Sequence, residues 1–178
     1  MNAAAGFAVR AAASGDIGAI ARIYAHHVLT GLASFEEEPP GEDEIARRFA
    51  DVSGRGLPWL VAADAAGSIL GYAYAAPFRL RSAYRYTLED SIYVAPEAQR
   101  RGIGRALLSE LIKRTTALGY RQIVAVIGDS ANLASITLHE RLGFRLIGAL
   151  PATGFKFGRW VDSVLMQRVL GEGAATAP

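Results

Sequence analysis

The 178-residue sequence contains no cysteine. This excludes a thiol nucleophile, an acyl-cysteine intermediate, a disulfide framework and a cysteine-ligated zinc or iron–sulfur site. No apolar run approaches the roughly 18 residues that a membrane span requires. Residues 1–10 lack the basic and long apolar segments of a secretory signal peptide. We therefore expect a cytoplasmic protein with no membrane association.

A large excess of charge of one sign is also missing. The 19 basic and 17 acidic residues leave a formal net charge of +2, too small for bulk electrostatic binding of nucleic acid. Apolar residues make up 51% of the chain, which argues against intrinsic disorder. At about 150 residues per domain, the length predicts a single domain over residues 1–170. Residues 171–178 are expected to form a flexible tail.

Hydrophobic periodicity and turn signals predict a mixed α/β domain, with antiparallel hairpins first and helix–strand alternation later. The segment 31–41 contains the acidic run 36–38 and two prolines, and is expected to be a loop or lid whose acids face solvent. The predicted strands are 7–10, 60–63, 69–75, 86–94, 123–127, 144–149 and 160–169. The predicted helices are 17–28, 42–51, 103–118 and 132–142.

A segment with two glycines between the strand 86–94 and the helix 103–118 has the properties of an anion-binding site. Glycine lets backbone N–H groups approach a ligand without a Cβ in the way, and a helix start adds partial positive charge. Three arginines add formal charge, so the segment predicts a pyrophosphate site; an ordinary surface loop is the alternative. Its residues are Gln99, Arg100, Arg101, Gly102, Ile103, Gly104 and Arg105.

Two common nucleotide motifs do not fit this segment. A P-loop requires Lys-Ser/Thr after its last glycine, where Arg105 and Ala106 stand. A dinucleotide-binding fingerprint requires a third glycine where Leu107 stands. The pair His26-His27 does not predict a metal site either, because adjacent helical positions diverge by about 100°.

The segment Gln99–Leu108 resembles motif A of the GNAT acetyltransferase superfamily, Q/R-x-x-G-x-G/A at the head of a long helix. One strand later, Asn132-x-x-Ser135-x-x-x-His139-x-x-x-Gly143-Phe144 resembles the second GNAT signature, a helix that ends in Gly-Phe. The resemblance implies an α/β fold of the α+β type, the GNAT fold. Its mixed central sheet has about seven strands, is splayed in the middle and is flanked by about four helices.

Three further segments, Ala33–Glu36, Pro77–Val94 and Gly154–Trp160, resemble phosphinothricin N-acetyltransferases. This resemblance implies transfer of the acetyl group of acetyl-CoA, without a metal, to the α-amine of a glutamate-like compound. Phosphinothricin, methionine sulfoximine and methionine sulfone are such compounds, and the resemblance links the chain with herbicide or antibiotic resistance. It also implies a homodimer. With no cysteine, we expect direct attack in a ternary complex.

Two other functions stay open. An enzyme of the same fold could acetylate a different amine, such as a polyamine, an aminoglycoside or a protein N-terminus. Clustered arginines disfavour a cationic acceptor, because like charges would be brought together. A non-catalytic acyl-CoA-binding sensor is the second alternative, since one fold hosts several functions.

Candidate catalytic residues follow from the chemistry of amine acetylation. An amine attacks only as its free base, and the resemblance assigns the role of general base to Glu89, which lies within a predicted strand. The alternative is a structural pair with Arg81 or Arg85. Asp90, on the opposite face by strand alternation, is a fallback base. His139 stands where many GNAT enzymes have a tyrosine; it either protonates the leaving thiolate or only lines the CoA site.

The resemblance also implies binding residues for both substrates. Ile92, Tyr93 and Val94 are expected to pair with the pantetheine arm through main-chain groups, in the manner of an added strand. The Asn132 amide is expected either to hold the CoA amides or to cap a helix. The candidate residues for the acceptor are Phe35, Arg81, Tyr84 and Lys156.

Overall fold

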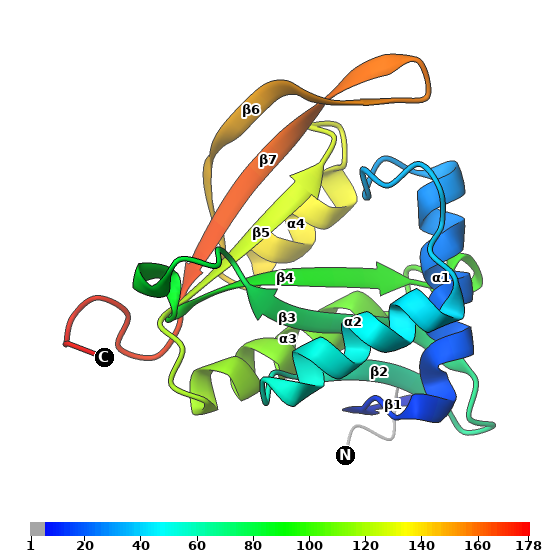
Figure 1. Cartoon of the computed structure of the whole chain (residues 1–178), viewed down its shortest axis with the longest axis horizontal. Helices are drawn as coiled ribbons and strands as arrows, with labels where there is room; N and C mark the ends of the chain where they lie inside the picture. The colour runs from blue at the N-terminus through cyan, green and yellow to red at the C-terminus, as the bar shows by residue number, and fades with distance from the viewer. Residues whose placement is uncertain (1–5) are drawn as a thin grey trace.

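The computed structural model describes residues 6–178 (Figure 1). Within this range the strands form one seven-stranded sheet in the order β1-β2-β3-β4-β5-β7-β6. The strands are β1 (Phe7–Ala11), β2 (Trp59–Asp64), β3 (Ile69–Pro77), β4 (Thr87–Val94), β5 (Gln122–Gly128), β6 (Arg145–Lys156) and β7 (Arg159–Val169). The helices are α1 (Ile17–Thr30), α2 (Glu42–Gly54), α3 (Ile103–Ala117) and α4 (Leu133–Arg141), with short 3-10 turns η1 (Ser14–Asp16), η2 (Ser82–Tyr84) and η3 (Pro96–Ala98).

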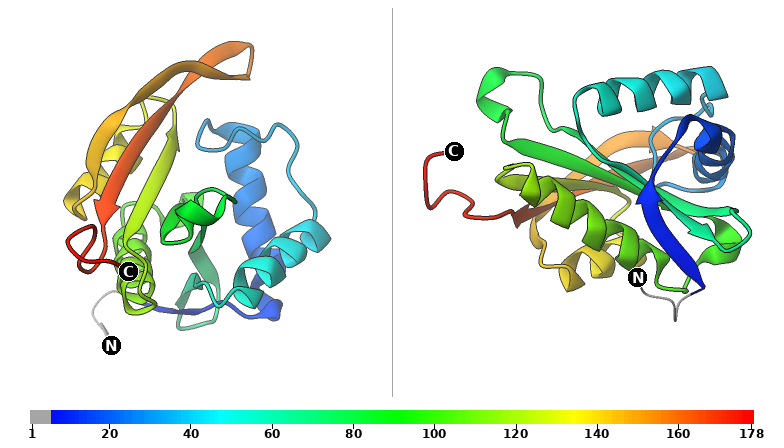
Figure 2. Two further views of the ribbon diagram at one scale, coloured as in Figure 1. Left: turned by 60° about the vertical axis from the view of Figure 1, so that its left-hand side comes forward. Right: turned by 90° about the horizontal axis from the view of Figure 1, so that it is seen from below.

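The helices cover both faces of the sheet. Helices α1 and α2 pack on one face of β2, β3 and β4, whereas α3 and α4 lie on the other face, against β1–β4 and against β5 and β6 respectively (Figure 2). The predicted mixed sheet with four flanking helices is therefore confirmed in the described residues.

Helix α3 illustrates how the sequence produces the core. Its apolar residues recur three and four positions apart, so they lie on one face, and Leu107, Leu108 and Leu111 are fully buried against the sheet. The helix ends before Gly119, which has a φ of +84° and accepts the left-handed conformation that follows many helices.

The sheet opens in the middle. Strands β4 and β5 run parallel and are paired only from Thr87 opposite Gln122 to Asp90 opposite Ala125. Beyond Asp90, β4 continues to pair with β3, and beyond Ala125, β5 continues to pair with β7. The two strands therefore separate at their carboxyl ends and leave a gap between two paired halves.

The β6–β7 hairpin is longer than predicted. The sequence predicted that the first strand ends at residue 149, but β6 runs on through Pro151 and Gly154 to Lys156. A register shift between Leu150 and Gly154 absorbs these residues, so pairing with β7 resumes beyond them. The hairpin extends away from the rest of the sheet in Figure 1.

The chain after β7 folds back on the α3–β5 connection. Arg121 contacts the carboxylate of Glu172 at 3.5 Å and hydrogen-bonds to the hydroxyl of Thr176 at 3.2 Å. None of the helices described within residues 6–178 is long and apolar enough to cross a membrane.

Candidate active site

The start of α3 borders a cleft of about 820 Å³, and α4 supplies the opposite wall through Leu138 and Arg141. Gly102 caps the helix with a φ of +78°, and Arg100 also has a positive φ of 61°. These turns bring the chain into the helix without a side-chain cap, so the first N–H groups of α3 stay available to a ligand. A helix start of this kind, flanked by Arg105, fits an anionic group such as a pyrophosphate.

Most of the residues predicted to hold CoA meet in this cleft. Arg101 is the exception, because it does not belong to the cleft lining formed by the described residues. The predicted residues that line the cleft are Ile92, Tyr93, Val94, Gln99, Arg100, Gly102, Ile103, Gly104, Arg105 and Asn132.

Two side chains show how this wall is fixed. The Asn132 carboxamide oxygen accepts the main-chain N–H of Ser135 at 3.2 Å, so Asn132 caps α4 while it also lines the cleft. Both predicted roles of Asn132 are thus compatible with one conformation. His27, which sequence reasoning considered only as a metal ligand, donates from Nε2 to the main-chain oxygen of Val94 at 2.9 Å.

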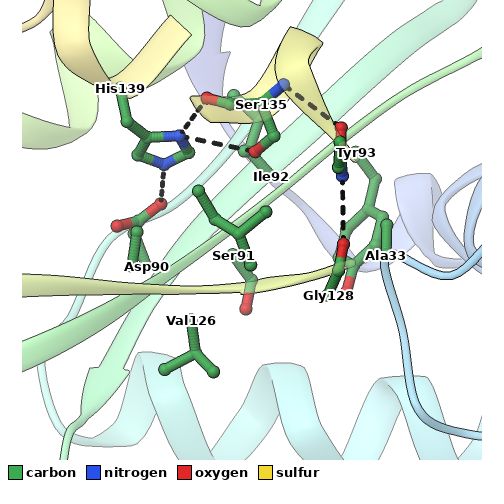
Figure 3. Close-up of a pocket in the computed structure, with 12 residues that line it drawn as sticks. Ala33, Asp90, Ser91, Ile92, Tyr93, Val126, Gly128, Ser135 and His139 are labelled. Carbon is green, nitrogen blue, oxygen red and sulfur yellow. Dashed lines mark hydrogen bonds and ion pairs between the residues drawn. The ribbon is translucent and has the colours of Figure 1, made fainter. Parts of the chain in front are cut away.

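Asp90 and His139 form a buried pair between β4 and α4. His139 Nε2 lies 3.0 Å from a carboxylate oxygen of Asp90, and the two side chains are 2% and 1% exposed respectively. His139 Nδ1 donates to the main-chain oxygen of Ser135 at 2.7 Å (Figure 3). Burial lowers the pKa of His139, but the hydrogen bond and charge of Asp90 outweigh it, so the pKa is raised overall.

This pair was missed by sequence reasoning, which gave Asp90 only the role of a fallback base. Strand alternation did place Asp90 on the face opposite Glu89, and that prediction is consistent with its contact to α4. The other Asp90 oxygen is buried without a hydrogen-bond partner in the described residues. Both ring nitrogens of His139 are occupied by protein groups, so neither points freely toward a ligand.

Glu89 is the partly buried carboxylate of β4, one residue before the strands separate. Among the ion pairs of residues 6–178, none includes Glu89, so the alternative pairing with Arg81 or Arg85 is not formed. Burial raises the pKa of Glu89, the charge of Asp90 raises it further, and Arg79 opposes the change. A carboxylate with a raised pKa is suited to accept a proton.

The loop between α1 and α2 is held by a polar network. Tyr24 donates its hydroxyl hydrogen to Glu36 at 2.8 Å, and the Ser34 hydroxyl also lies 2.8 Å from the Tyr24 oxygen. Arg48 forms an ion pair with Glu36 at 2.7 Å. The expectation that residue 36 faces only solvent is therefore wrong, because α2 folds back over this loop and supplies Arg48.

The four residues predicted to bind the acceptor fall into two groups. Phe35 is 40% exposed on the α1–α2 loop, and Lys156 is fully buried with Nζ donating to the main-chain oxygen of Ser34 at 2.7 Å. Arg81 and Tyr84 belong to the exposed β3–β4 connection around η2. Arg81 lines a separate cleft of about 240 Å³. No described contact joins the two groups, and within residues 6–178 no cluster of three acidic or histidine side chains is placed to hold a metal ion.

The splayed sheet, the glycine-capped helix start and the buried strand carboxylate together define an acyl-CoA-dependent acyltransferase of the GNAT type. The chain belongs to the acetyltransferase (GNAT) family, whose model matches residues 20–144. It is therefore an acetyltransferase, as the resemblance in the sequence predicted.

Individual proteins similar to this chain come from one group within the family. The chain is 54% identical to phosphinothricin N-acetyltransferase of Alcaligenes faecalis, over 96% of this chain and 86% of that protein. It is 42% identical to the L-methionine sulfoximine/L-methionine sulfone acetyltransferase of Pseudomonas paraeruginosa, over 89% and 92% respectively. A crystal structure of a phosphinothricin acetyltransferase from Sinorhizobium meliloti in complex with acetyl-CoA superposes with a TM-score of 0.94 at 54% identity. The alignment covers 97% of this chain and 93% of that chain.

Proposed function

We propose that this protein transfers the acetyl group of acetyl-CoA to the α-amine of a small glutamate-like amino acid analogue such as phosphinothricin, methionine sulfoximine or methionine sulfone. The observation that carries the proposal is Glu89, a partly buried carboxylate without an ion-pair partner in the described residues, at the point where β4 and β5 separate. Two relatives whose names contain these compounds support the class of acceptor. A cytoplasmic location stays a prediction.

The chemistry follows from the residues around the gap. Acetyl-CoA supplies an activated acetyl group as a thioester. Glu89 takes a proton from the acceptor ammonium, and the free amine forms a bond to the acetyl carbon while the carbon–sulfur bond breaks. Main-chain N–H groups of Ile92–Val94 that face the gap polarise the carbonyl group as negative charge develops on its oxygen. Because the chain has no cysteine, we propose direct transfer within a ternary complex.

In this proposal His139 lines the CoA site and does not protonate the leaving thiolate. Its Nε2 would have to leave Asp90 before it could protonate a thiolate, at the cost of a buried carboxylate without a hydrogen bond. We therefore assign His139 to the wall of the CoA site, where it links α4 to β4. The thiolate then takes up, through solvent, the second proton, which the acceptor nitrogen loses as the amide forms.

The test is release of CoA thiol with a panel of acceptors. The panel holds phosphinothricin, methionine sulfoximine, methionine sulfone, ordinary amino acids, spermidine and an aminoglycoside. Selective turnover of the first three supports the proposal. Turnover of spermidine or the aminoglycoside alone contradicts the acceptor class, and tight CoA binding without turnover of any acceptor favours a sensor.

Substitution of Gly104 is expected to weaken binding of acetyl-CoA. A Cβ at Gly104 would lie 3.2 Å from Leu138 on the opposite wall, so the larger Gly104→Val side chain narrows the cleft between α3 and α4. We expect the dissociation constant to rise at least about 10-fold, equivalent to about 1.4 kcal/mol. Isothermal titration with acetyl-CoA measures this change. Gly54→Val, at a position with open space, is the control, and equal affinity in both variants would contradict the assigned site.

We further propose that the protein is a homodimer that uses the β6–β7 hairpin. This hairpin exposes an unusual concentration of large apolar side chains, which typically marks a protein interface. Ile147→Glu is expected to convert a dimer to a monomer in light scattering coupled to size exclusion. Leu118→Glu, an exposed leucine outside the hairpin, should leave the mass unchanged. A wild-type monomer would contradict the proposal. The exposed residues are Leu146, Ile147, Leu150, Phe155, Phe157 and Trp160.

A further inference from the structure

The main-chain groups of β4 alternate in direction along the strand. In an antiparallel pair, every second residue of a strand hydrogen-bonds to its neighbour, and the residues between them face the other side. Directly after β4, Ala95 donates its N–H to the main-chain oxygen of Leu70 at 2.9 Å, so the odd-numbered residues of β4 face β3. Ile92 and Val94 lie beyond the last pair with β5. Their N–H and C=O groups are therefore directed toward the gap.

His27 binds the last of these gap-facing groups. It lies in the last turn of α1, and its Nε2 donates to the main-chain oxygen of Val94 at 2.9 Å. Its ring packs on Tyr93, with the ring centres 5.4 Å apart, and it lines the 820 Å³ cleft. Burial lowers the pKa of His27, so the ring is neutral near pH 7 and carries its hydrogen on the nitrogen that faces the carbonyl oxygen.

This contact fixes one peptide group at both ends. The C=O of Val94 and the N–H of Ala95 belong to the same planar peptide unit. Helix α1 holds the C=O through His27, and β3 holds the N–H through Leu70. The residues that follow form η3 and lead into α3. The fixed peptide unit therefore lies between the gap-facing edge of β4 and the anion-binding start of α3.

Acetyl-CoA needs these two parts of the site at a set distance from each other. Its pyrophosphate suits the start of α3, and its pantetheine arm carries two amides that can pair with an open strand edge. The thioester stands at the far end of the same arm. Because one ligand spans both parts, any looseness between them must be removed on binding, and this costs affinity.

We infer that His27 is a positioning residue for the pantetheine arm of acetyl-CoA. By tying Val94 to α1, it holds the open edge of β4 in the place that the arm requires relative to the start of α3. His27 acts through Val94 and takes no part in proton transfer. This inference rests on the proposed function only in that the cleft holds acetyl-CoA, and it does not depend on the acceptor.

The test is isothermal titration with two ligands. One is acetyl-CoA, and the other is adenosine 3′-phosphate 5′-diphosphate, the part of CoA without the pantetheine arm. His27→Phe keeps an aromatic ring but removes the N–H. We expect the dissociation constant of acetyl-CoA to rise about 3–10-fold, the range for one lost hydrogen bond, and that of the nucleotide to stay unchanged. His27→Gln, whose amide can donate from the position of Nε2, should restore most of the affinity for acetyl-CoA.

The neighbouring histidine supplies a matched control. His26 is exposed, and its ring contacts the hydroxyl of Thr30 within the same helix at 3.2 Å. His26→Phe should therefore leave both dissociation constants unchanged. His27→Asn is a second variant without the contact, because its shorter side chain does not reach Val94. It should behave as His27→Phe does, so the test does not depend on the folding of one variant.

Three results would overturn the inference. The first is unchanged affinity for acetyl-CoA in folded His27→Phe or His27→Asn. The second is an equal loss of affinity for the nucleotide, which indicates general damage to the fold. The third is a failure of His27→Gln to restore binding. Absence of acetyl-CoA binding by the wild-type protein overturns both the inference and the proposed function, whereas normal binding without turnover of any acceptor contradicts the proposed function alone.

Discussion

Replacing Glu89 with glutamine is expected to lower kcat for acetyl transfer by about 10²–10⁴-fold, the usual contribution of a general base. Glutamine keeps the shape and polarity of the side chain but cannot take the proton of the ammonium group. Glu89 lies outside the 820 Å³ cleft lining, so the dissociation constant of acetyl-CoA should not change. Thiol release measures kcat, and isothermal titration measures the affinity.

The pH dependence sharpens this prediction. A base acts when ionised, so wild-type kcat/KM should fall as the pH falls through the pKa of Glu89. Burial and the charge of Asp90 raise that pKa above the usual range of a glutamate. The acidic limb should therefore lie at a higher pH than for an ordinary carboxylate and should be absent in Glu89→Gln. Glu97→Gln, at an exposed position of η3, is the matched control. An unchanged rate in Glu89→Gln would remove Glu89 from the mechanism.

Asp90→Ala is expected to destabilise the folded protein by about 3 kcal/mol at mildly acidic pH. This is the low end of the range for breaking a buried ion pair, because the unpaired imidazole of His139 can lose its proton. For a domain of this length the melting temperature should fall by about 6–12 °C. Thermal unfolding followed by circular dichroism measures it. Asp51→Ala, which removes an exposed ion pair with Arg55, should cost less than about 1 kcal/mol.

The direction in which pH changes the effect of Asp90→Ala distinguishes an ion pair between Asp90 and His139 from a purely steric role of Asp90. The pKa of His139 is raised in the folded state. The free energy of folding that protonation of His139 contributes is therefore fully present below the pKa that His139 has in the unfolded chain. It is lost as the pH rises through the pKa that His139 has in the folded protein. The loss in melting temperature caused by Asp90→Ala should therefore be larger at about pH 6 than at about pH 9. A loss of equal size at both pH values would show that Asp90 acts only by filling space.

Local signals in the sequence predicted the helices and strands and many of the residues that line the 820 Å³ cleft. The glycines before α3 and the apolar spacing within it lie in one continuous segment, so their geometry depends on neighbours in the chain. The same holds for Asn132, whose cap contact spans three residues. The similarity to known motifs then supplied the mixed, splayed sheet, which periodicity alone does not specify, whereas the order of the strands comes from the structure.

The contacts that organise the site depend on residues far apart in the sequence. Asp90 meets His139 across 49 residues, and Lys156 meets Ser34 across 122 residues. Sequence patterning indicates which face of a strand a residue occupies but not which helix residue lies opposite. Glu36 illustrates the consequence, because an acidic run usually faces solvent, and only the position of α2 brings Arg48 to it.

The separation of β4 and β5 gives the free protein two unpaired strand edges in the interior of its sheet. Exposed edges at the margin of a sheet invite pairing with other chains and hence aggregation. Here β3 and β7 cover the outer sides of the two strands, so each edge is open only toward the gap. Another chain could reach these edges only by entering between the two paired halves of the sheet. The fold thus places unpaired main-chain groups in the interior of the sheet, away from the margins where sheets of different molecules add to one another.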